Sequence, residues 1–546
     1  MERRRFLQIF TVAGAFLAGL FRPSTVEAQV APTVTADPAE LTLPPGGSAM
    51  VMVSVDPASP YGVGSVTIPV TVPDPYDGTI EGDTSVTVPA GQHWHVTGNV
   101  NLTGDLIVEG LLTGVDTFEV QGNGFQILVQ NGGQLDLAGV PKSGWVDWDI
   151  PVIGWLPGDR LAVAPTAWQK TLLLPLTSWA GDWAGMTRPV DAPDVTLIDG
   201  SVQRPEVANL DRTITFRNLR RLHFLGAGVQ TLKHFAVVDS GTAGVLGDYP
   251  IHFHLNGEAS RGSLLEGVVV EGGKNHAFVP HGSHGVTMRD CVAYNTIGNV
   301  YWWDPPTVKT DPLDPNNSND LLFDRCLALV ANSNSDRLTA FTIGGGTNNE
   351  WVGCVAVGVQ GGKNSSGYNW QENFVAVFDG GNKAHNNRRN GIFTWSNSSS
   401  LHVIDGFVSY HNRRFGISHG SYVNRFVYRN VVNHVGVPIA SGSDETATIG
   451  ESAIGAILFE NIVTDDRLLV LQHSLPASPV THRNCSYTGV VYREGTAPDE
   501  DPSEIHFEDC GLTPADFNMV GARPGSIAKI YEGGVLTHRW AAGAWS

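Results

Sequence analysis

Two nearly identical stretches, "HNNRRNGI" and "HNRRFGI", begin at His385 and His411 and reveal a repeat. Arg388 and Arg413 lie 25 residues apart, as do the glycine and isoleucine that follow each arginine pair. Short apolar runs separated by Gly, Asn and Asp surround both stretches, a pattern typical of β-strands joined by turns. A unit this short cannot bury its own apolar face. We therefore expect successive units to stack as the coils of a solenoid.

The cysteines support the same interpretation, because all five fall at one phase of the strand pattern. Their contexts are "MRDCVAY", "FDRCLAL", "WVGCVAV", "HRNCSYT" and "FEDCGLT". Cys291 and Cys326 are 35 residues apart, Cys326 and Cys354 are 28 apart, and Cys485 and Cys510 are 25 apart. Free cysteine behaves as a small apolar residue, so we expect stacked interior thiols rather than disulfides or metal ligands. The richness in strands makes the expected solenoid a parallel β-helix.

The overall charge argues against a nucleic-acid partner. The chain carries 34 basic and 54 acidic residues, for a formal net charge of −20. Proteins that bind nucleic acid depend on lysine and arginine at the phosphates. We therefore expect no nucleic-acid partner, although local basic patches remain compatible with this balance.

The first 30 residues have the pattern of an export signal. Basic residues at the start are followed by a short apolar run from Ile9 to Phe21, whereas a membrane span needs about 20 apolar residues. "RRRFLQ" is similar to the twin-arginine export motif, and "VEA" offers a cleavage site that ends at Ala28. We expect the mature chain to lie in the periplasm, at the cell surface or outside the cell. No later segment is apolar enough to predict a transmembrane span.

Histidines are concentrated around the stretch "GDYPIHFHLNGE". His252, His254, His276, His281 and His284 place five of the 18 histidines within 33 residues. Alternate residues of a strand share a face, so His252 and His254 point the same way. Three interpretations stay open: a zinc site, catalytic or substrate-contacting imidazoles, and a structural hydrogen-bond network inside the solenoid. The turn-like "HGSHG" makes His281 and His284 the expected exposed pair.

A carboxylate and several aromatic residues follow the histidines. Asp304 is the first candidate for a catalytic carboxyl group, with a turn carboxylate as the alternative. Trp302, Trp303 and Trp395 are candidates for a platform on which sugar rings stack, with capping of the coils as the alternative. Glycoside hydrolysis needs two carboxyl groups. Elimination from a uronate instead needs a base and a group that neutralises the substrate carboxylate.

The paired arginines of the repeat would stack on one edge of adjacent coils. Strand spacing places Arg388, Arg389, Arg413 and Arg414 within roughly 5–10 Å of one another across the two coils. Arginine offers bidentate geometry to carboxylates and sulfates, so these residues are candidates for an anionic substrate subsite. The alternative is a solvated turn with acidic neighbours.

Several stretches together resemble one family, the G8-domain and parallel β-helix proteins that include the cell-surface hyaluronidases. "VTVPAGQHWHV" and "GDLIVEGLL" resemble the opening of a G8 domain, and "WLPGDRLAVAPT" resembles the segment that closes it. "GDYPIHFHLNGE" and "HGSHGVTMRDCVAYNTIGNVYWWD" are similar to the most recognisable part of the β-helix. The resemblance covers roughly residues 84–430. The sequence departs from the family at Asp248, His276 and Asn299.

The resemblance implies a G8-like β domain followed by a right-handed parallel β-helix, within an all-β chain. It also implies an extracellular polysaccharide as the partner, and calcium is the one cofactor that it suggests. We expect an exported protein that cleaves an anionic polysaccharide, by hydrolysis or elimination, in a groove on the β-helix. The alternative is a carbohydrate-binding or structural protein without catalysis. The expected divisions are an export signal (1–28), a linker or small β extension (29–83), a G8-like domain (84–210) and the β-helix (211–546).

Overall fold

A computed structural model of the chain describes most residues beyond position 75. The described residues are 76–167, 187–304, 307, 311, 313–370, 375–394, 401–419, 425–434, 447–450, 457–470, 479–494 and 504–546, with the strand segments 34–37, 48–55, 65–71 and 177–178. The expected export signal lies outside these residues. Two compact units are present, residues 1–77 and residues 78–546.

The first unit contains one small antiparallel sheet. Its strands are β1 (Val34–Asp37), β2 (Ser48–Val55) and β3 (Ser65–Thr71), in the order β1-β2-β3. These strands fall within the stretch for which a linker or a small β extension was expected.

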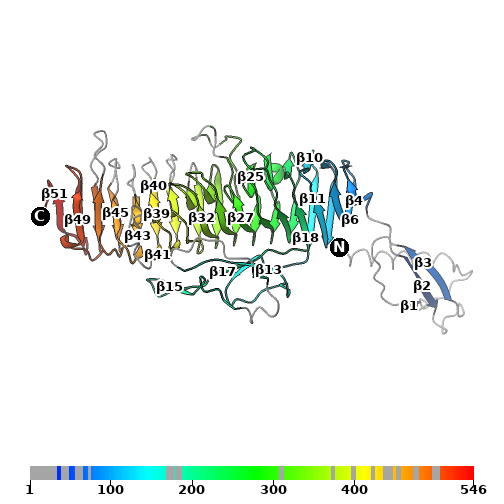
Figure 1. The fold of residues 1–546 in the computed structure, drawn as a ribbon, viewed down its shortest axis with the longest axis horizontal. Coiled ribbons are helices and arrows are strands. Elements are labelled where there is room, and N and C mark those ends of the chain that lie inside the picture. The colour runs from blue at the N-terminus through cyan, green and yellow to red at the C-terminus, as the bar shows by residue number, and fades with distance from the viewer. Residues whose placement is uncertain are drawn as a thin grey trace, which may run out of the picture. The chain divides into compact units, whose positions relative to one another are not determined.

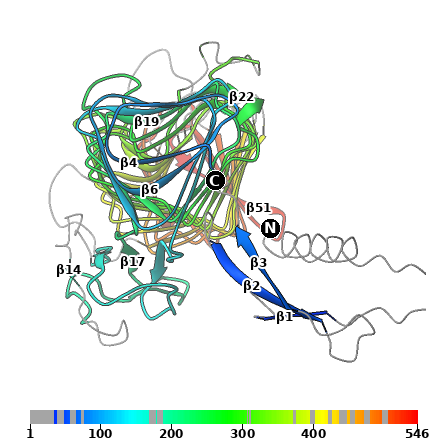
Figure 2. The same cartoon turned by 90° about the vertical axis from the view of Figure 1, so that its right-hand side faces the viewer.

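The second unit is a stack of β-coils with three parallel faces, seen from the side in Figure 1 and along the stack in Figure 2. We name the faces 1, 2 and 3 in the order in which each coil visits them. The first strands, β4 (Gly78–Thr84) and β6 (His93–Leu102), pair in parallel, and β6 continues into faces 1 and 2. The predicted all-β parallel β-helix is therefore confirmed.

Face 1 is the longest ladder, and its last three strands are antiparallel. Its strands are β8 (Leu111–Asp116), β11 (Gln134–Gly139), β20 (Thr231–Lys233), β23 (Leu264–Glu266), β26 (Thr287–Arg289), β28 (Leu322–Asp324), β31 (Thr347–Val352), β34 (Val375–Asp379), β37 (Leu401–Asp405), β40 (Arg425–Arg429), β43 (Ile457–Glu460), β46 (Val480–Arg483), β48 (Glu504–Glu508), β50 (Ile527–Glu532), β51 (Val535–Ala541) and β52 (Ala544–Trp545). Face 2 consists of β9 (Phe118–Gln121), β18 (Ile214–Arg217), β21 (Phe235–Val238), β24 (Val269–Glu271), β27 (Val292–Ile297), β29 (Leu327–Asn332), β32 (Val355–Gln360), β35 (Lys383–His385), β38 (Val408–Tyr410), β41 (Val432–His434) and β44 (Val463–Thr464).

Face 3 carries the histidine-rich strands. It consists of β5 (Thr87–Val88), β7 (Leu106–Val108), β10 (Gln126–Gln130), β19 (Arg221–Leu225), β22 (Ile251–Gly257), β25 (Phe278–Ser283), β30 (Thr339–Ile343), β33 (Ser366–Trp370), β36 (Asn390–Thr394), β39 (Phe415–His419), β42 (Ala447–Gly450), β45 (Leu468–Val470), β47 (Val490–Arg493) and β49 (Phe517–Gly521). Tyr301 bridges β25 and β30, pairing with Phe278 on one side and Phe341 on the other. Two 3-10 turns, Glu258–Ser260 and Pro514–Asp516, lie between strands of the stack.

The corner between faces 1 and 2 explains the phase of the cysteines. Each cysteine directly follows a residue with a left-handed φ, and these residues are Asp290, Arg325, Gly353, Asn484 and Asp509. The chain turns at this residue, and the next side chain points into the coil. Four of the five thiols are buried, the fifth is half-buried, and none forms a disulfide. The prediction of stacked interior thiols is confirmed, because Cys291, Cys326 and Cys354 belong to one continuous core.

An insertion interrupts one early coil between β11 and β18. Its strands are β12 (Trp145–Asp147), β13 (Arg160–Val163), β14 (Thr177–Ser178), β15 (Val195–Thr196), β16 (Val202–Gln203) and β17 (Glu206–Asn209). The antiparallel sheet β12-β17-β13-β14 packs apolar side chains, among them Trp145 and Leu210, against the outside of face 2. Figure 2 shows β14 and β17 on a different side of the stack from β19 and β22.

Parallel pairing runs without a break across the expected boundary between residues 210 and 211. β10 pairs with β19 and β9 pairs with β18, so the strands of the G8-like stretch form the first coils of the same β-helix. In the described part of the chain, no helix is long and apolar enough to cross a membrane.

Candidate functional site: a histidine cluster on face 3

The strand β22 alternates between the core and the outer surface of the coil. Ile251 and Phe253 belong to the apolar interior, so His252 and His254 share the outer side of face 3. Their ring centroids are 5.0 Å apart. The predicted common face is confirmed, and the pair does not point into the solenoid.

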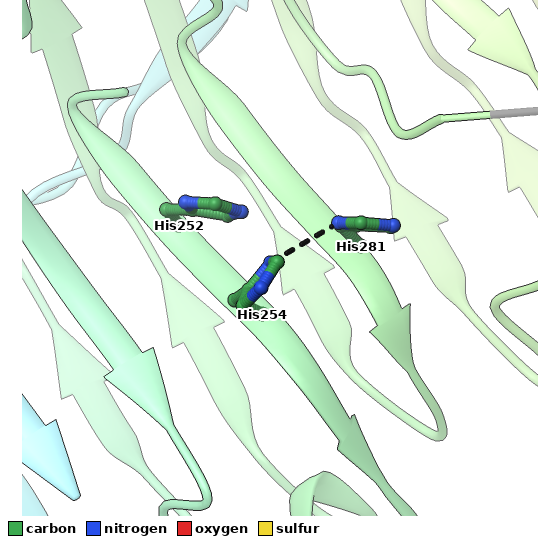
Figure 3. Close-up of side chains that lie close together, drawn as sticks. All are labelled: His252, His254 and His281. Carbon is green, nitrogen blue, oxygen red and sulfur yellow. Dashed lines mark hydrogen bonds between the residues drawn. The ribbon is translucent and has the colours of Figure 1, made fainter. Parts of the chain in front are cut away.

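Parallel register brings two more histidines to this pair. His223 on β19 lies opposite His252, and His281 on β25 lies opposite His254. The rings of His223 and His252 stack with their centroids 4.9 Å apart. The Nδ1 atoms of His254 and His281 are 3.2 Å apart, as the dashed line in Figure 3 marks. We call these four imidazoles the histidine cluster.

Burial keeps much of this cluster uncharged. It lowers the pKa of His252 to about 2 and that of His223 to about 3. The neighbouring imidazoles add to the effect on His252, and Arg221 adds to the effect on His223. His254 is half-buried, and its pKa is lowered first by burial and then by the proximity of His281 and Arg221. Neutral imidazoles act as bases or as metal ligands, so the cluster is suited to either task.

Asp304 joins the cluster through His281. Its Oδ2 lies 3.7 Å from His281 Nε2, and the same nitrogen is 2.9 Å from Oδ1 of Asn316. Burial raises the pKa of the Asp304 carboxyl, and the nearby His281 partly offsets this increase. The side chain of Asp304 is 36% exposed, so solvent or a ligand can reach it. The first carboxylate candidate from the sequence therefore lies beside a histidine.

The rings of Tyr249, His276 and Trp302 pack against one another next to the histidine cluster. Trp302 lies over His276 with a centroid distance of 4.2 Å, and Tyr249 packs on His276 at 5.1 Å. Tyr249 also contacts the edge of the His252 ring at 4.8 Å. Trp302 stays partly exposed, and aromatic faces of this kind can stack on sugar rings.

Two further candidates do not belong to the cluster. Trp303 is completely buried, stacks in the core on Phe323 and Trp351, and cannot contact a substrate. Its assignment to a sugar platform is wrong, because the strand alternation that turns Trp302 outward turns Trp303 inward. Trp395 lies outside the described residues.

The expectation that His281 and His284 of "HGSHG" form an exposed pair is also wrong. His281 is only 8% exposed, because Asn316 and Asp304 cover it. His284 comes after the end of β25, and its Nδ1 accepts a hydrogen bond from the backbone N–H of Asn319. This contact holds His284 on the turn, and the structure does not bring it to the other histidines.

The four arginines of the repeat stack as predicted but lie away from the histidines. The backbone N–H groups of Arg413 and Arg414 donate to the backbone carbonyls of Asn387 and Arg389 in the previous coil, each at 3.0 Å. Strand β36 follows Arg388 and Arg389. Four strand spacings separate it from β25, or about 19 Å. The arginines can therefore contact only a more distant unit of a ligand bound at the histidine cluster.

Sequence reasoning missed His223, although a signal for it exists. "LHF" at Leu222–Phe224 and "IHF" at Ile251–Phe253 repeat the same pattern one coil apart. The contributions of Tyr249 and Asn316 have no comparable signal, because they depend on how loops fold back over face 3.

Comparisons with known proteins point to the same region. Residues 224–305 match the CEMIP beta-helix family, and this stretch holds His252, His254, His281 and Asp304. Over 215 residues the chain is 22% identical to the human cell surface hyaluronidase CEMIP2, covering 33% of this chain and 14% of that protein. Over 217 residues it is 26% identical to the human cell migration-inducing and hyaluronan-binding protein, covering 33% of this chain and 15% of that protein.

A third relative carries the G8 domain in its name. A G8 domain-containing protein of Dictyostelium discoideum is 27% identical over 111 residues, covering 19% of this chain and 8% of that protein. The alignments thus cover at most 15% of the length of these three relatives. The predicted resemblance to the G8-domain and parallel β-helix proteins that include the cell surface hyaluronidases is therefore confirmed, with the family match confined to residues 224–305.

Proposed function

We propose that this protein is exported and acts on an anionic extracellular polysaccharide at the histidine cluster of face 3. One observation carries the proposal. Imidazoles from three adjacent coils and the Asp304 carboxyl converge on the outer side of the β-helix, and all of these residues except His223 lie within the stretch that matches the CEMIP beta-helix family. Relatives described as a hyaluronidase and as a hyaluronan-binding protein support a glycan as the ligand.

The cluster offers two groups that a ligand can reach. His254 is half-buried, and about a third of the surface of the Asp304 side chain is exposed to solvent. A neutral His254 can accept a proton, and an Asp304 carboxyl with a raised pKa can donate one. Trp302 lies on the same side and would stack on a sugar ring next to these groups.

The proton-transfer groups favour elimination over two-carboxylate hydrolysis. Hydrolysis by the common route needs a pair of carboxyl groups, and the described cluster contributes one, Asp304. In elimination, His254 would take the proton from C5 of a uronate. The electron pair would form the C4–C5 double bond, and the glycosidic oxygen would leave, protonated by Asp304. Arg221, whose Nη1 lies 3.5 Å from Asp248, is an arginine beside the cluster that could balance the substrate carboxylate.

The test is incubation of the purified mature protein with hyaluronan, chondroitin, alginate and pectin. Reducing ends and the ultraviolet absorbance of an unsaturated uronate are measured together. We expect both signals to rise with at least one polymer, and His254→Gln and Asp304→Asn to abolish them. Reducing ends without the absorbance would refute elimination in favour of hydrolysis. Retained binding without cleavage across the panel would refute catalysis and leave a carbohydrate-binding protein.

The export part of the proposal has its own test. A fusion of residues 1–28 to a reporter that works only after translocation should give signal in a host with a functional twin-arginine pathway. Replacing Arg3 and Arg4 by lysine should abolish that signal. An unchanged signal in a host that lacks the pathway would contradict the twin-arginine assignment.

A further inference from the structure

Three imidazoles of the cluster are close enough to share one ion. A ring nitrogen from each of His252, His254 and His281 lies within 4.8 Å of the other two. Two of these residues come from β22 and the third from the adjacent β25, so rigid parallel strands hold all three. Figure 3 shows the three rings gathered on the same side of these strands.

Hydrogen bonds fix which nitrogen of His252 is free to bind. Its Nδ1 lies 3.0 Å from the carbonyl oxygen of Gly247, so this nitrogen carries the proton and donates it. The lone pair is therefore on Nε2, which is buried and has no hydrogen-bond partner among the described residues. Buried polar atoms in native proteins nearly always have a hydrogen-bond partner or a bound ion. We therefore expect this nitrogen to bind a ligand.

A side-chain carbonyl sets the tautomer of His281 in the same way. Asn316 donates from Nδ2 to Thr307 Oγ1 at 3.1 Å, which turns its Oδ1 toward His281 Nε2 at 2.9 Å. Since that nitrogen donates, the lone pair of His281 is on Nδ1, which faces His254. Metal-bound histidines typically have this arrangement, in which the distal ring N–H donates to a carbonyl or carboxylate oxygen.

The spacing of two of the nitrogens already fits a metal. Nitrogens bound to tetrahedral zinc at about 2.0–2.1 Å are about 3.3 Å apart. His254 Nδ1 and His281 Nδ1 are 3.2 Å apart. One nitrogen of each of the three rings lies within 4.8 Å of the others, so the His252 ring is close enough to supply a third ligand after a small movement.

We propose that His252 Nε2, His254 and His281 Nδ1 bind one divalent transition-metal ion, with zinc the best match. Three neutral nitrogens and an open fourth position are typical of zinc sites that bind water or substrate. Calcium prefers six to eight oxygens, so the cofactor suggested by the family resemblance does not suit these ligands. The proposal goes beyond the glycan-directed function. While an ion occupies the lone pair of His254, this residue cannot act as the base, so metal binding and elimination through His254 belong to alternative states of the cluster.

The surroundings of the three histidines match this assignment. Asp304, 3.7 Å from His281 Nε2, supplies a negative charge beside the site. Arg221, a cation beside the cluster, is held in place because it donates hydrogen bonds to Gln126 at 2.7 Å and to the Gly247 carbonyl at 3.2 Å. His223 stacks on His252 and excludes water from one side of the ring.

The test measures metal binding and needs no substrate. Untagged full-length protein is stripped with a chelator, dialysed, and titrated with zinc by calorimetry, and cobalt(II) is added to a second sample for its visible spectrum. We expect one zinc per chain and the intense cobalt bands of a tetrahedral nitrogen site. His254→Gln and His281→Gln should each weaken binding by about 100-fold or more, and Asn316→Ala by about 10-fold.

His284→Gln is the matched control, since His284 lies one residue beyond β25 and outside the cluster. It should bind zinc as the unmodified protein does. Absence of a stoichiometric site in the unmodified protein would overturn the proposal whatever the variants do. Equal zinc affinity of the unmodified protein and His281→Gln would also overturn it, and circular dichroism of each variant establishes that it is folded.

Discussion

A buried histidine far from the cluster gives a quantitative prediction about acid stability. His402 on β37 is 1% exposed, and its ring lies 4.9 Å from Phe426 and 5.5 Å from Trp370, measured between centroids. Neither of its ring nitrogens has a hydrogen-bond partner in the described part of the chain. Burial without partners lowers its pKa to about 4 from a usual value of 6.5.

The sign and size of the effect follow from proton linkage. The unfolded chain protonates His402 near pH 6.5, whereas the folded chain does so only near pH 4. Below pH 6.5 the unfolded state therefore binds more protons, and the stability that neutral His402 provides is lost as the pH falls. Between pH 7 and pH 5 this one residue reduces the free energy of unfolding by about 2 kcal/mol.

The assay compares His402→Leu with the unmodified protein by urea unfolding at pH 7 and pH 5. Leucine is apolar and cannot titrate. Lowering the pH from 7 to 5 should therefore raise the free energy of unfolding of the variant by about 2 kcal/mol relative to that of the unmodified protein. Val355→Ala removes a buried apolar side chain from a different cluster without removing a titratable group, and its effect should be the same at both pH values. An equal free-energy difference between His402→Leu and the unmodified protein at both pH values would refute the reasoning.

Other buried groups give shorter predictions. Trp303→Ala should cost about 3–5 kcal/mol in urea unfolding, whereas Trp302→Ala should change stability little and weaken glycan binding in a pull-down with the polymer that is cleaved. Lys383→Met should cost about 3–5 kcal/mol, because Lys383 Nζ lies 2.9 Å from Oε1 of the fully buried Glu206, whose charge would lose this partner. The four buried thiols, Cys291, Cys326, Cys354 and Cys485, should resist a thiol reagent in the folded protein and react after unfolding, and rapid labelling of these four under native conditions would contradict their burial.

The sequence predicts the solenoid because its local and global patterns agree. Each of the five cysteines comes just after a corner residue, and only stacked coils give that position the same surroundings each time. The shared face of His252 and His254 follows from the period of a strand alone. In the same way, "LHF" and "IHF" could have placed His223 beside His252.

Other parts of the site depend on contacts that no local pattern encodes. The inward turn of Trp303 depends on Tyr301 bridging β25 and β30, which fixes the phase of that stretch. The distance between arginines and histidines depends on how many coils lie between them. The packing of the insertion joins residues far apart in sequence, as when Trp145 Nε1 donates to the Arg325 carbonyl at 2.6 Å. Such contacts become visible only in three dimensions.

The most direct test of the central claim is a crystal structure of the Asp304→Asn variant with an acidic oligosaccharide from the polymer that the protein cleaves or binds. We expect a sugar ring against Trp302 and a uronate within hydrogen-bond reach of His254 on face 3. The remaining units should run along the coils toward Arg388 and Arg413. An oligosaccharide bound elsewhere on the β-helix, with the histidine cluster untouched, would contradict the account.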